Sequence, residues 1–402
     1  MKTLAPPAPE SSDAARLAVL LLAGVVAALN IGKLPPALPA LQQSFGMTLV
    51  QASFLVSVFQ AAGMGFGLFG GVLADRFGAR RVMGCGLGLL ALASVAGALS
   101  ADAGTLLAMR AIESAGFILT VLPGPALIRR VVPFGSLGVA LGYWGSYMPT
   151  GMSLALVATP WLMAAGGWQL AWWCSASAAL ATLVLLRRVV APDPPHGAEP
   201  VRVLALARDT LRAPGPWLLA ACFGLYAGQF IAVFGFLPTA YQSAGIAPTT
   251  AGLLTAFGVA ANMSGNIVSG LLLHRGATRT AVLAGASLVM GVATVIAFDV
   301  EFAFGWRYAA VLLFSAVGGL IPGTLFTTAP RFAPYAGAVS TTTGLMQQGS
   351  AIGQFISPPL VAAVASSAGG WHHTWWVTSA FALVNIVVAV LIGRRDRRLV
   401  AR

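Results

Sequence analysis

Three charged residues interrupt stretches of this chain that are otherwise apolar: Lys33, Arg110 and Glu113. If these stretches cross a membrane, each charge costs about 2.5–3.5 kcal/mol on insertion scales, so such side chains face a cavity or one another. Arg110 and Glu113 are one helical turn apart, and the three together carry a net charge of +1 when Glu113 is ionised. Lys33 and Arg110 could attract an anion, and Glu113 could bind and release a proton. The alternatives are a structural ion-pair cluster and, for Lys33, a side chain that reaches the membrane surface.

Neutral polar side chains form a second group of candidates. Several recur three or four residues apart, which places two side chains on one face of a helix. They are Asn30, Tyr143 with Tyr147, Tyr226 with Gln229, Asn262 with Asn266, and Thr343 with Gln347. Side-chain amides at such positions also bridge helices, so both interpretations stay open for each residue.

The composition identifies the elements that must position these residues. The chain is 58% hydrophobic and 8% charged, whereas soluble domains are about 25% charged. Residues 131–186, 213–273 and 332–393 contain no Asp, Glu, Lys or Arg, and each run is long enough for two membrane helices of about 20 residues. We therefore expect an all-α membrane protein with spans at about 16–40, 48–73, 81–101, 104–128, 135–163, 168–186, 215–239, 249–273, 280–298, 307–329, 336–364 and 373–393.

The positive charges predict the orientation of these spans. With the N-terminus inside, all of the 23 Lys and Arg residues except Lys33, Arg110 and Arg307 fall on the cytoplasmic side. This asymmetry is the positive-inside rule, so the net charge of +12 indicates topology rather than nucleic-acid binding. We expect an integral protein of the inner (plasma) membrane with both termini in the cytoplasm. Cys85, Cys174 and Cys222 lack any paired spacing, which predicts neither a disulfide framework nor a metal site.

The two halves of the chain repeat each other at an offset of 199 residues, as in the matches of Pro39 to Pro238 and of Asn30 to Gln229. Near the end of each half the offset becomes 203, where GGWQLAWW (166–173) matches GGWHHTWW (369–376). The repeat predicts two six-helix bundles related by an axis along the membrane normal. The predicted parts are a tail (1–15), an N-terminal bundle (16–187), a cytoplasmic linker (188–214) with a short amphipathic helix at 201–212, a C-terminal bundle (215–393) and a basic tail (394–402).

The stretch GVLADRFGARR (71–81) between the second and third spans carries a motif. Its acid follows a helix C-terminus, which is unfavourable for an anion, so the acid needs cationic partners. A weaker copy, GLLLHRGATR, occupies 270–279 and has His274 where the first copy has Asp75. An ion-pair cluster here suits a cytoplasmic gate, and a basic loop that only obeys topology is the alternative. The gate candidates are Gly71, Asp75, Arg76, Gly78, Arg80, Arg81 and Arg275.

At these residues the sequence resembles the major facilitator superfamily, whose signature between helices two and three is G-x-L-a-D-r-x-G-r-r. The resemblance covers essentially the whole chain and implies a central cavity, alternating access and a monomer. It also implies that Asp75 and Arg76 help to latch the cytoplasmic side. RAIESAG (110–116) partly matches a fourth-helix motif of the family, and GYWGSYMPTGM (142–152) lacks the full antiporter pattern. LPGPALIRR, YWGSYMPTGM and GWQLAWW are loosely similar to the cyanate and nitroimidazole-type permease branch.

The function expected from these features is proton-coupled secondary transport of a small organic solute, with an anion preferred. Efflux of lipophilic or cationic compounds is the alternative, and a non-transporting receptor of the same fold is a remote one. The sequence contains no G-x-x-x-x-G-K-[ST] loop of a primary pump. It also places only one acid within the helices, which argues against a membrane-embedded enzyme. We expect a small-molecule substrate, protons and the lipid bilayer as partners, no nucleic acid, no metal and no cofactor.

Overall fold

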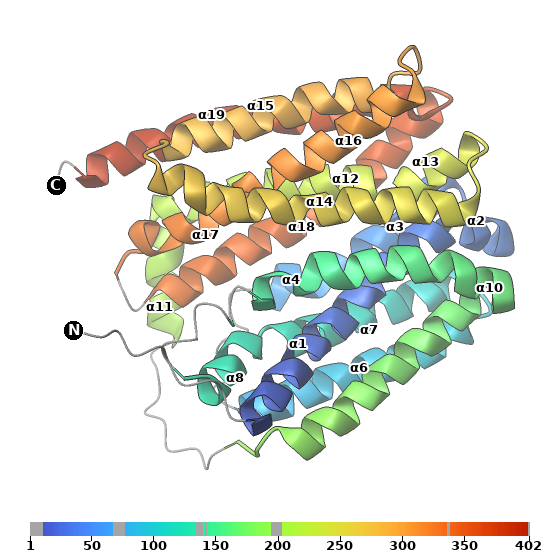
Figure 1. Ribbon diagram of the computed structural model, residues 1–402, viewed down its shortest axis with the longest axis horizontal. Coiled ribbons are helices and arrows are strands. Elements are labelled where there is room, and N and C mark those ends of the chain that lie inside the picture. The colour runs from blue at the N-terminus through green and yellow to red at the C-terminus, as the bar shows by residue number, and fades with distance from the viewer. Residues whose placement is uncertain are drawn as a thin grey trace.

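The computed structural model describes residues 11–66, 77–133, 140, 143–193, 203–335 and 338–400, and every regular element in this part is a helix (Figure 1). The N-terminal half contains α1 (Ser11–Gly32), α2 (Leu34–Phe45), α3 (Leu49–Ser57), η1 (Val58–Gln60), α4 (Ala61–Phe66), α6 (Ala79–Ala98), α7 (Ala103–Val121), α8 (Gly124–Val131) and α10 (Tyr147–Val189). The C-terminal half contains α11 (Val203–Arg212), α12 (Pro214–Phe234), α13 (Leu237–Ser243), α14 (Pro248–His274), α15 (Arg279–Phe298), α16 (Phe304–Gly318), α17 (Leu320–Phe332), α18 (Val339–Ser367), η4 (Trp371–His373) and α19 (Trp375–Val400).

The helices agree with twelve membrane spans. Within the described ranges, nine helical stretches are long and apolar enough to cross a membrane, and Leu49–Gly65 is a shorter apolar helix. One of the nine, which contains α10, supplies two passes because the backbone at Gly166 and Gly167 is non-helical and the chain reverses there. The nine stretches therefore supply ten passes, and Leu49–Gly65 and α18 add one pass each. The resulting twelve passes confirm the fold class expected from the sequence.

Among the described residues, several spans are divided into two helical segments, and in four of them the divisions follow the repeat. The first span breaks at Lys33 between α1 and α2, and its repeat partner breaks between α12 and α13. The fourth and tenth spans break between α7 and α8 and between α16 and α17. A proline lies in the first two positions of α2, α8 and α13, where its missing N–H costs nothing because the first N–H groups of a helix have no intrahelical partner.

The two ends of the molecule differ in charge. The start of α1, the end of α19 and α11 lie at one end in Figure 1, where α8 and α10 also have arginines in their last turns. We call this the basic end and the opposite end, with α2, α13 and the reversal of α10, the distal end. The predicted amphipathic helix at 201–212 is confirmed as α11, which lies at the basic end (Figure 1).

The two bundles contact each other toward the distal end and in the middle of the molecule. The contacting pairs include α2 with α13, α3 and α4 with α18, and α10 with α14. One close approach is at Gly252 of α14, where an added Cβ atom would overlap the carbonyl oxygen of Leu156 in α10. Ser153 Oγ of α10 donates to the carbonyl of Ala256 at 3.2 Å in the same contact. Only glycine at position 252 permits this approach, so the described contacts hold the distal end closed.

Candidate functional site

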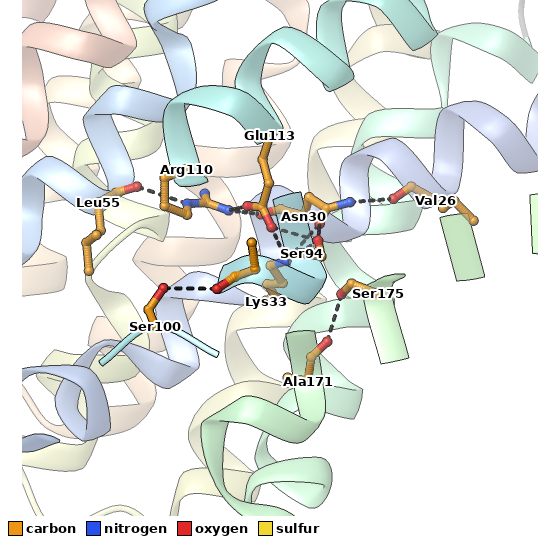
Figure 2. Close-up of polar contacts among 11 residues, drawn as sticks. Val26, Asn30, Lys33, Leu55, Ser94, Ser100, Arg110, Glu113, Ala171 and Ser175 are labelled. Atoms are coloured by element: carbon orange, nitrogen blue, oxygen red, sulfur yellow. Dashed lines mark hydrogen bonds and ion pairs between the residues drawn. The ribbon is translucent and has the colours of Figure 1, made fainter. Parts of the chain in front are cut away.

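The three charged residues singled out in the sequence lie together. Lys33 Nζ donates to Glu113 Oε1 at 2.7 Å, and Arg110 Nη1 donates to Glu113 Oε2 at 2.5 Å (Figure 2). Ser94 Oγ donates to Glu113 Oε1 at 2.7 Å, and Lys33 Nζ donates to Asn30 Oδ1 at 2.8 Å. We call these five residues the charged cluster, in which one carboxylate bridges two cations.

The charged cluster is buried inside the N-terminal bundle. Its side chains come from α1, the break after it, α6 and α7. The side chains of Lys33, Arg110 and Glu113 are 2%, 1% and 0% exposed, so none of them faces solvent in this conformation. Arg110 and Glu113 are neighbours because residues three apart share one face of α7. The helix spacing therefore places one excess positive charge in the interior of the bundle.

Aromatic rings and backbone oxygens compensate these buried cations. The guanidinium of Arg110 lies 4.4 Å from the centre of the Phe59 ring, and Lys33 Nζ lies 4.5 Å from that of Trp172. Arg110 Nη1 also donates to the backbone oxygen of Asn30 at 2.8 Å. Cation–π contacts strengthen when the cation is removed from water, and together these contacts partly offset the cost of burying the excess charge.

A cavity of about 230 Å³ lies beside the charged cluster, between α1 and the two arms of α10. Its polar lining in the described part of the chain comes from Lys33, Thr159, Cys174 and Ser175, and Lys33 is the only member of the charged cluster that lines it. The rest of the lining is apolar and consists of alanine and leucine side chains, so Lys33 is the one charged group in the described lining. Lys33 is therefore the member of the cluster that borders open space.

The C-terminal half contains a neutral cluster formed by α12, α14 and α16. Asn262 Nδ2 donates to Tyr226 Oη at 2.9 Å and to the carbonyl of Ser315 at 3.0 Å. Asn266 Nδ2 donates to Asn262 Oδ1 at 3.1 Å. The structure thus brings together three of the neutral residues predicted from the sequence, without any charge among them.

Other predicted residues lie apart from both clusters. Gln229 is buried, and its Nε2 donates to the carbonyl of Leu225 in its own helix at 3.3 Å. The Tyr147 ring packs against Trp144 with 5.0 Å between ring centres, whereas Tyr143 is exposed. The described ring contacts therefore place Tyr147 in the core of the N-terminal bundle.

The eleventh span contributes to the contact between the bundles through two of its glutamines. Gln60 Nε2 donates to Gln354 Oε1 at 3.2 Å, and Gln348 Nε2 donates to a backbone carbonyl of α4 at 2.6 Å. Of the two predicted residues on α18, Thr343 donates to a carbonyl of its own helix and Gln347 is exposed. Side-chain amides therefore link the two bundles in the middle of the molecule.

The predicted gate motif is only partly visible. Gly71, Asp75 and Arg76 lie outside the described residues. Gly78 has a φ of 91°, in the region that favours glycine, as expected for the tight turn before α6. Arg275 is exposed at the C-terminus of α14.

A carboxylate from the linker caps the N-terminus of α6. Asp193 accepts from the backbone N–H groups of Arg80 and Arg81, each at 3.1 Å, and from Arg130 Nη1 at 2.8 Å. Burial raises the pKa of the Asp193 carboxyl, but these three hydrogen bonds and the charge of Arg130 outweigh it, so the pKa lies below its usual value. This N-terminal clamp ties the last span of the first half to its third and fourth spans.

The C-terminal half has an equivalent clamp. Asp396 Oδ2 lies 2.9 Å from Arg279 Nη1, and Asp396 Oδ1 lies 3.3 Å from Arg331 Nε. Asp193 and Asp396 are 203 residues apart, the offset at which the tryptophan-rich segments repeat. Neither acid was predicted from the sequence, although this offset was the signal that could have identified them.

The charged cluster can exchange a proton and attract an anion, whereas the neutral cluster can only exchange hydrogen bonds. In the described ranges no group of three or more His, Cys, Asp or Glu side chains is placed to hold a metal ion.

Comparisons with known proteins identify the family and the fold. A family model described as Major Facilitator Superfamily matches residues 20–358. The chain is 31% identical over 214 residues to the puromycin resistance protein pur8 of Streptomyces alboniger, which covers 52% of this chain and 40% of that protein. It is 28% identical over 156 residues to a probable 4-methylmuconolactone transporter of Cupriavidus pinatubonensis, with 38% and 36% covered. In both cases the match spans less than half of the relative's length.

Among solved structures, the fold is similar to that of a bacterial homologue of the human lysosomal transporter Spinster in an inward-facing, unoccupied conformation. The TM-score is 0.83 at 15% identity, and the match covers 98% of this chain and 99% of that one. At this identity the likeness concerns the fold alone.

Proposed function

The chain belongs to the major facilitator superfamily, and on that premise we propose that it is a secondary transporter that moves a small organic anion across the membrane together with protons. The family's members named above are transporters and resistance proteins rather than enzymes. The observation that carries the preference for an anion is the buried excess of positive charge in the charged cluster, because the neutral cluster opposite offers no compensating carboxylate.

In this proposal the solute binds between the two bundles, and the charged cluster biases it toward negative charge. Lys33 and Arg110 supply that bias, and one member of the cluster exchanges a proton during each cycle. Amides and tyrosines of the neutral cluster provide hydrogen bonds to uncharged parts of the solute. The predicted neutral residues outside the clusters, Tyr143, Gln229, Thr343 and Gln347, remain candidates for the pathway in other conformations.

A second candidate function is export of lipophilic or cationic compounds. The C-terminal bundle contains a row of aromatic rings in contact, formed by Phe223, Tyr226, Phe230 and Phe234. Such a row suits an apolar or cationic aromatic compound, and one relative is named for resistance to puromycin.

We also propose the topology and assembly that the charge pattern favours. The protein is an integral multi-pass membrane protein, and its basic end faces the cytoplasm of a cell whose inner membrane it spans. It works as a monomer, without a nucleic-acid partner or cofactor, through two bundles with the boundaries 16–187 and 215–393. Asp75 and Arg76 latch the cytoplasmic side in the conformation in which it closes.

Flux into proteoliposomes tests this function. Purified protein is reconstituted with a pH-sensitive dye inside, and a panel of small carboxylates that includes 4-methylmuconolactone is compared with puromycin under an imposed proton gradient. We expect carboxylate entry that the gradient accelerates and that Lys33→Met abolishes. Transport of puromycin alone, unaffected by Lys33→Met, would establish the second candidate. Flux of no compound in the panel would contradict the proposed anion transport and would favour a receptor.

A further inference from the structure

We propose that Lys33, rather than Glu113, is the residue of the charged cluster that releases and takes up the coupling proton. The inference rests on the proposed proton-coupled function and names the residue behind it. It follows from the charge count of the cluster, from the hydrogen bonds on each carboxylate oxygen, and from the cavity that borders Lys33.

The charge count opposes protonation of Glu113. With Glu113 ionised, the buried cluster carries a charge of +1 from two cations and one anion. Protonation of Glu113 would leave two cations, Lys33 and Arg110, beside a neutral acid, with a charge of +2 inside the bundle. Loss of a proton from Lys33 would instead leave the neutral Arg110–Glu113 pair. Because an unpaired buried charge costs several kcal/mol, the second change is the one that the interior favours.

The hydrogen bonds lead to the same residue. Glu113 Oε2 is held by Arg110, and Glu113 Oε1 is held by both Lys33 and Ser94. If Lys33 becomes a neutral amine, Ser94 and Arg110 still donate to the two oxygens, so the carboxylate stays satisfied. Arg110 does not release a proton in proteins, whereas a lysine does so when buried. Lys33 is thus the only cation of the cluster that can change its charge.

The cavity gives the proton a route. Lys33 borders the cavity of about 230 Å³ between α1 and α10, and Glu113 and Arg110 are absent from its described lining. In the proposed step the N–H bond of the ammonium breaks, the nitrogen keeps the electron pair, and the proton passes to a water molecule that reaches Lys33 from the cavity side. Uptake is the reverse step. The groups that face Lys33 are Glu113 and Arg110 from α7, Ser94 from α6, Asn30 from α1, and Trp172 and Cys174 from α10.

The place of Lys33 in the fold links this charge change to movement. Lys33 is the residue between α1 and α2, so it ends one helical segment and precedes the other. The segment α2 packs against α13 of the other bundle at the distal end. The ion pair of Lys33 with Glu113 therefore anchors the start of the segment that closes this end. Deprotonation of Lys33 removes this ion pair and so weakens the contact that holds the start of α2 in place.

The chain allows a direct test because its sequence contains only two lysines, Lys2 and Lys33. Protein labelled with ¹⁵N at the lysine Nζ atoms is placed in lipid bilayers, and its nitrogen spectrum is recorded from about pH 5 to about pH 9. An ordinary lysine stays an ammonium over this range because its pKa is about 10.4. The Lys2→Arg variant leaves a single labelled lysine. We expect its signal to change from ammonium to amine within the range.

Labelling of the glutamate carboxyl carbons in the same samples tests the competing residue. Glu113→Gln identifies the Glu113 signal among those of the four glutamates, Glu10, Glu113, Glu199 and Glu301. We expect the Glu113 carboxyl to stay ionised across the range. In Glu113→Gln the amine form of Lys33 should appear at lower pH than in the parent, because the counterion is gone. Ser94→Ala, which removes a neutral hydrogen-bonding group, should change this pH much less.

An ammonium signal of Lys33 that persists throughout the range would overturn the proposal, and so would protonation of the Glu113 carboxyl within it. These spectra need no substrate, so their outcome is separate from that of the flux assay. Proton-coupled flux with a lysine that never becomes an amine would retain the proposed function and reject Lys33. A titrating Lys33 without flux would retain the proton site and reject the transported solute class.

Discussion

Removal of the single buried acid should destabilise the protein far more than removal of one of its two cations. Glu113→Gln leaves Lys33 and Arg110 around a neutral amide at a site where none of the three side chains is more than 2% exposed. Removing one partner of a buried ion pair costs about 3–5 kcal/mol. Lys33→Met leaves the Arg110–Glu113 pair with Ser94 still donating. It loses one charge-assisted hydrogen bond of about 1.5–3 kcal/mol, part of which is offset because the excess charge disappears.

Thermal unfolding in detergent, with each variant beside the parent, measures this difference. At about 2–4 °C per kcal/mol for a unit of 150–250 residues, the cost for Glu113→Gln corresponds to about 6–20 °C. Lys33→Met should lower the midpoint by clearly less. If Lys33 can become neutral, the loss for Glu113→Gln should also shrink as the pH rises. Equal losses for the two variants, or a larger loss for Lys33→Met, would refute the charge-count argument.

Two further predictions concern the ends of the molecule. Gly252→Val should separate the bundles at the distal end and speed the reaction of an impermeant maleimide with a cysteine placed at Ser153, whereas Gly285→Val, where a Cβ atom meets open space, should not. Unchanged labelling in both variants would show that the Gly252 contact does not close this end. Asp193→Asn should lower the thermal midpoint at pH 7. Because the pKa of Asp193 lies below its usual value of about 3.9, its contribution is present at neutral pH and is lost as the pH falls below about 4, so parent and variant should converge there. A difference that persists at pH 3 would contradict this.

Much of the fold could be predicted from the sequence because its signals are local. Uncharged runs of sufficient length predict spans, and the repeat predicts two six-helix bundles. In the structure these bundles have matching breaks at α1–α2 and α12–α13. The amphipathic helix α11 was also expected from a short stretch of residues. Each of these inferences needs only the order of residues along one segment, so side-chain contacts over long distances do not affect it.

The candidate site was predicted less completely because its contacts join distant segments. The spacing of Arg110 and Glu113 predicts their pairing, but the contact of Lys33 with Ser94 depends on how α1 and α6 are rotated against each other. No local pattern encodes that rotation. Asp193 was not predicted for a different reason. It lies in a polar linker in which an acidic residue is not unusual, and its role follows only from its hydrogen bonds to the start of α6 and the end of α8.

The difference between the two halves argues that the charged cluster serves function rather than architecture. Asn30 and its repeat partner Gln229 occupy equivalent places on the first span of each half. Asn30 belongs to a cluster with three charges, whereas Gln229 bonds to its own helix and its Oε1 has no hydrogen-bond partner among the described residues. The C-terminal bundle thus builds the same arrangement of helices from neutral groups. Since buried ion pairs rarely add net stability over apolar packing, the fold did not require charges at this position in the N-terminal bundle. A charged group that the architecture does not need, beside a cavity and at the start of α2, is what the proposed exchange of a proton and binding of a solute would require.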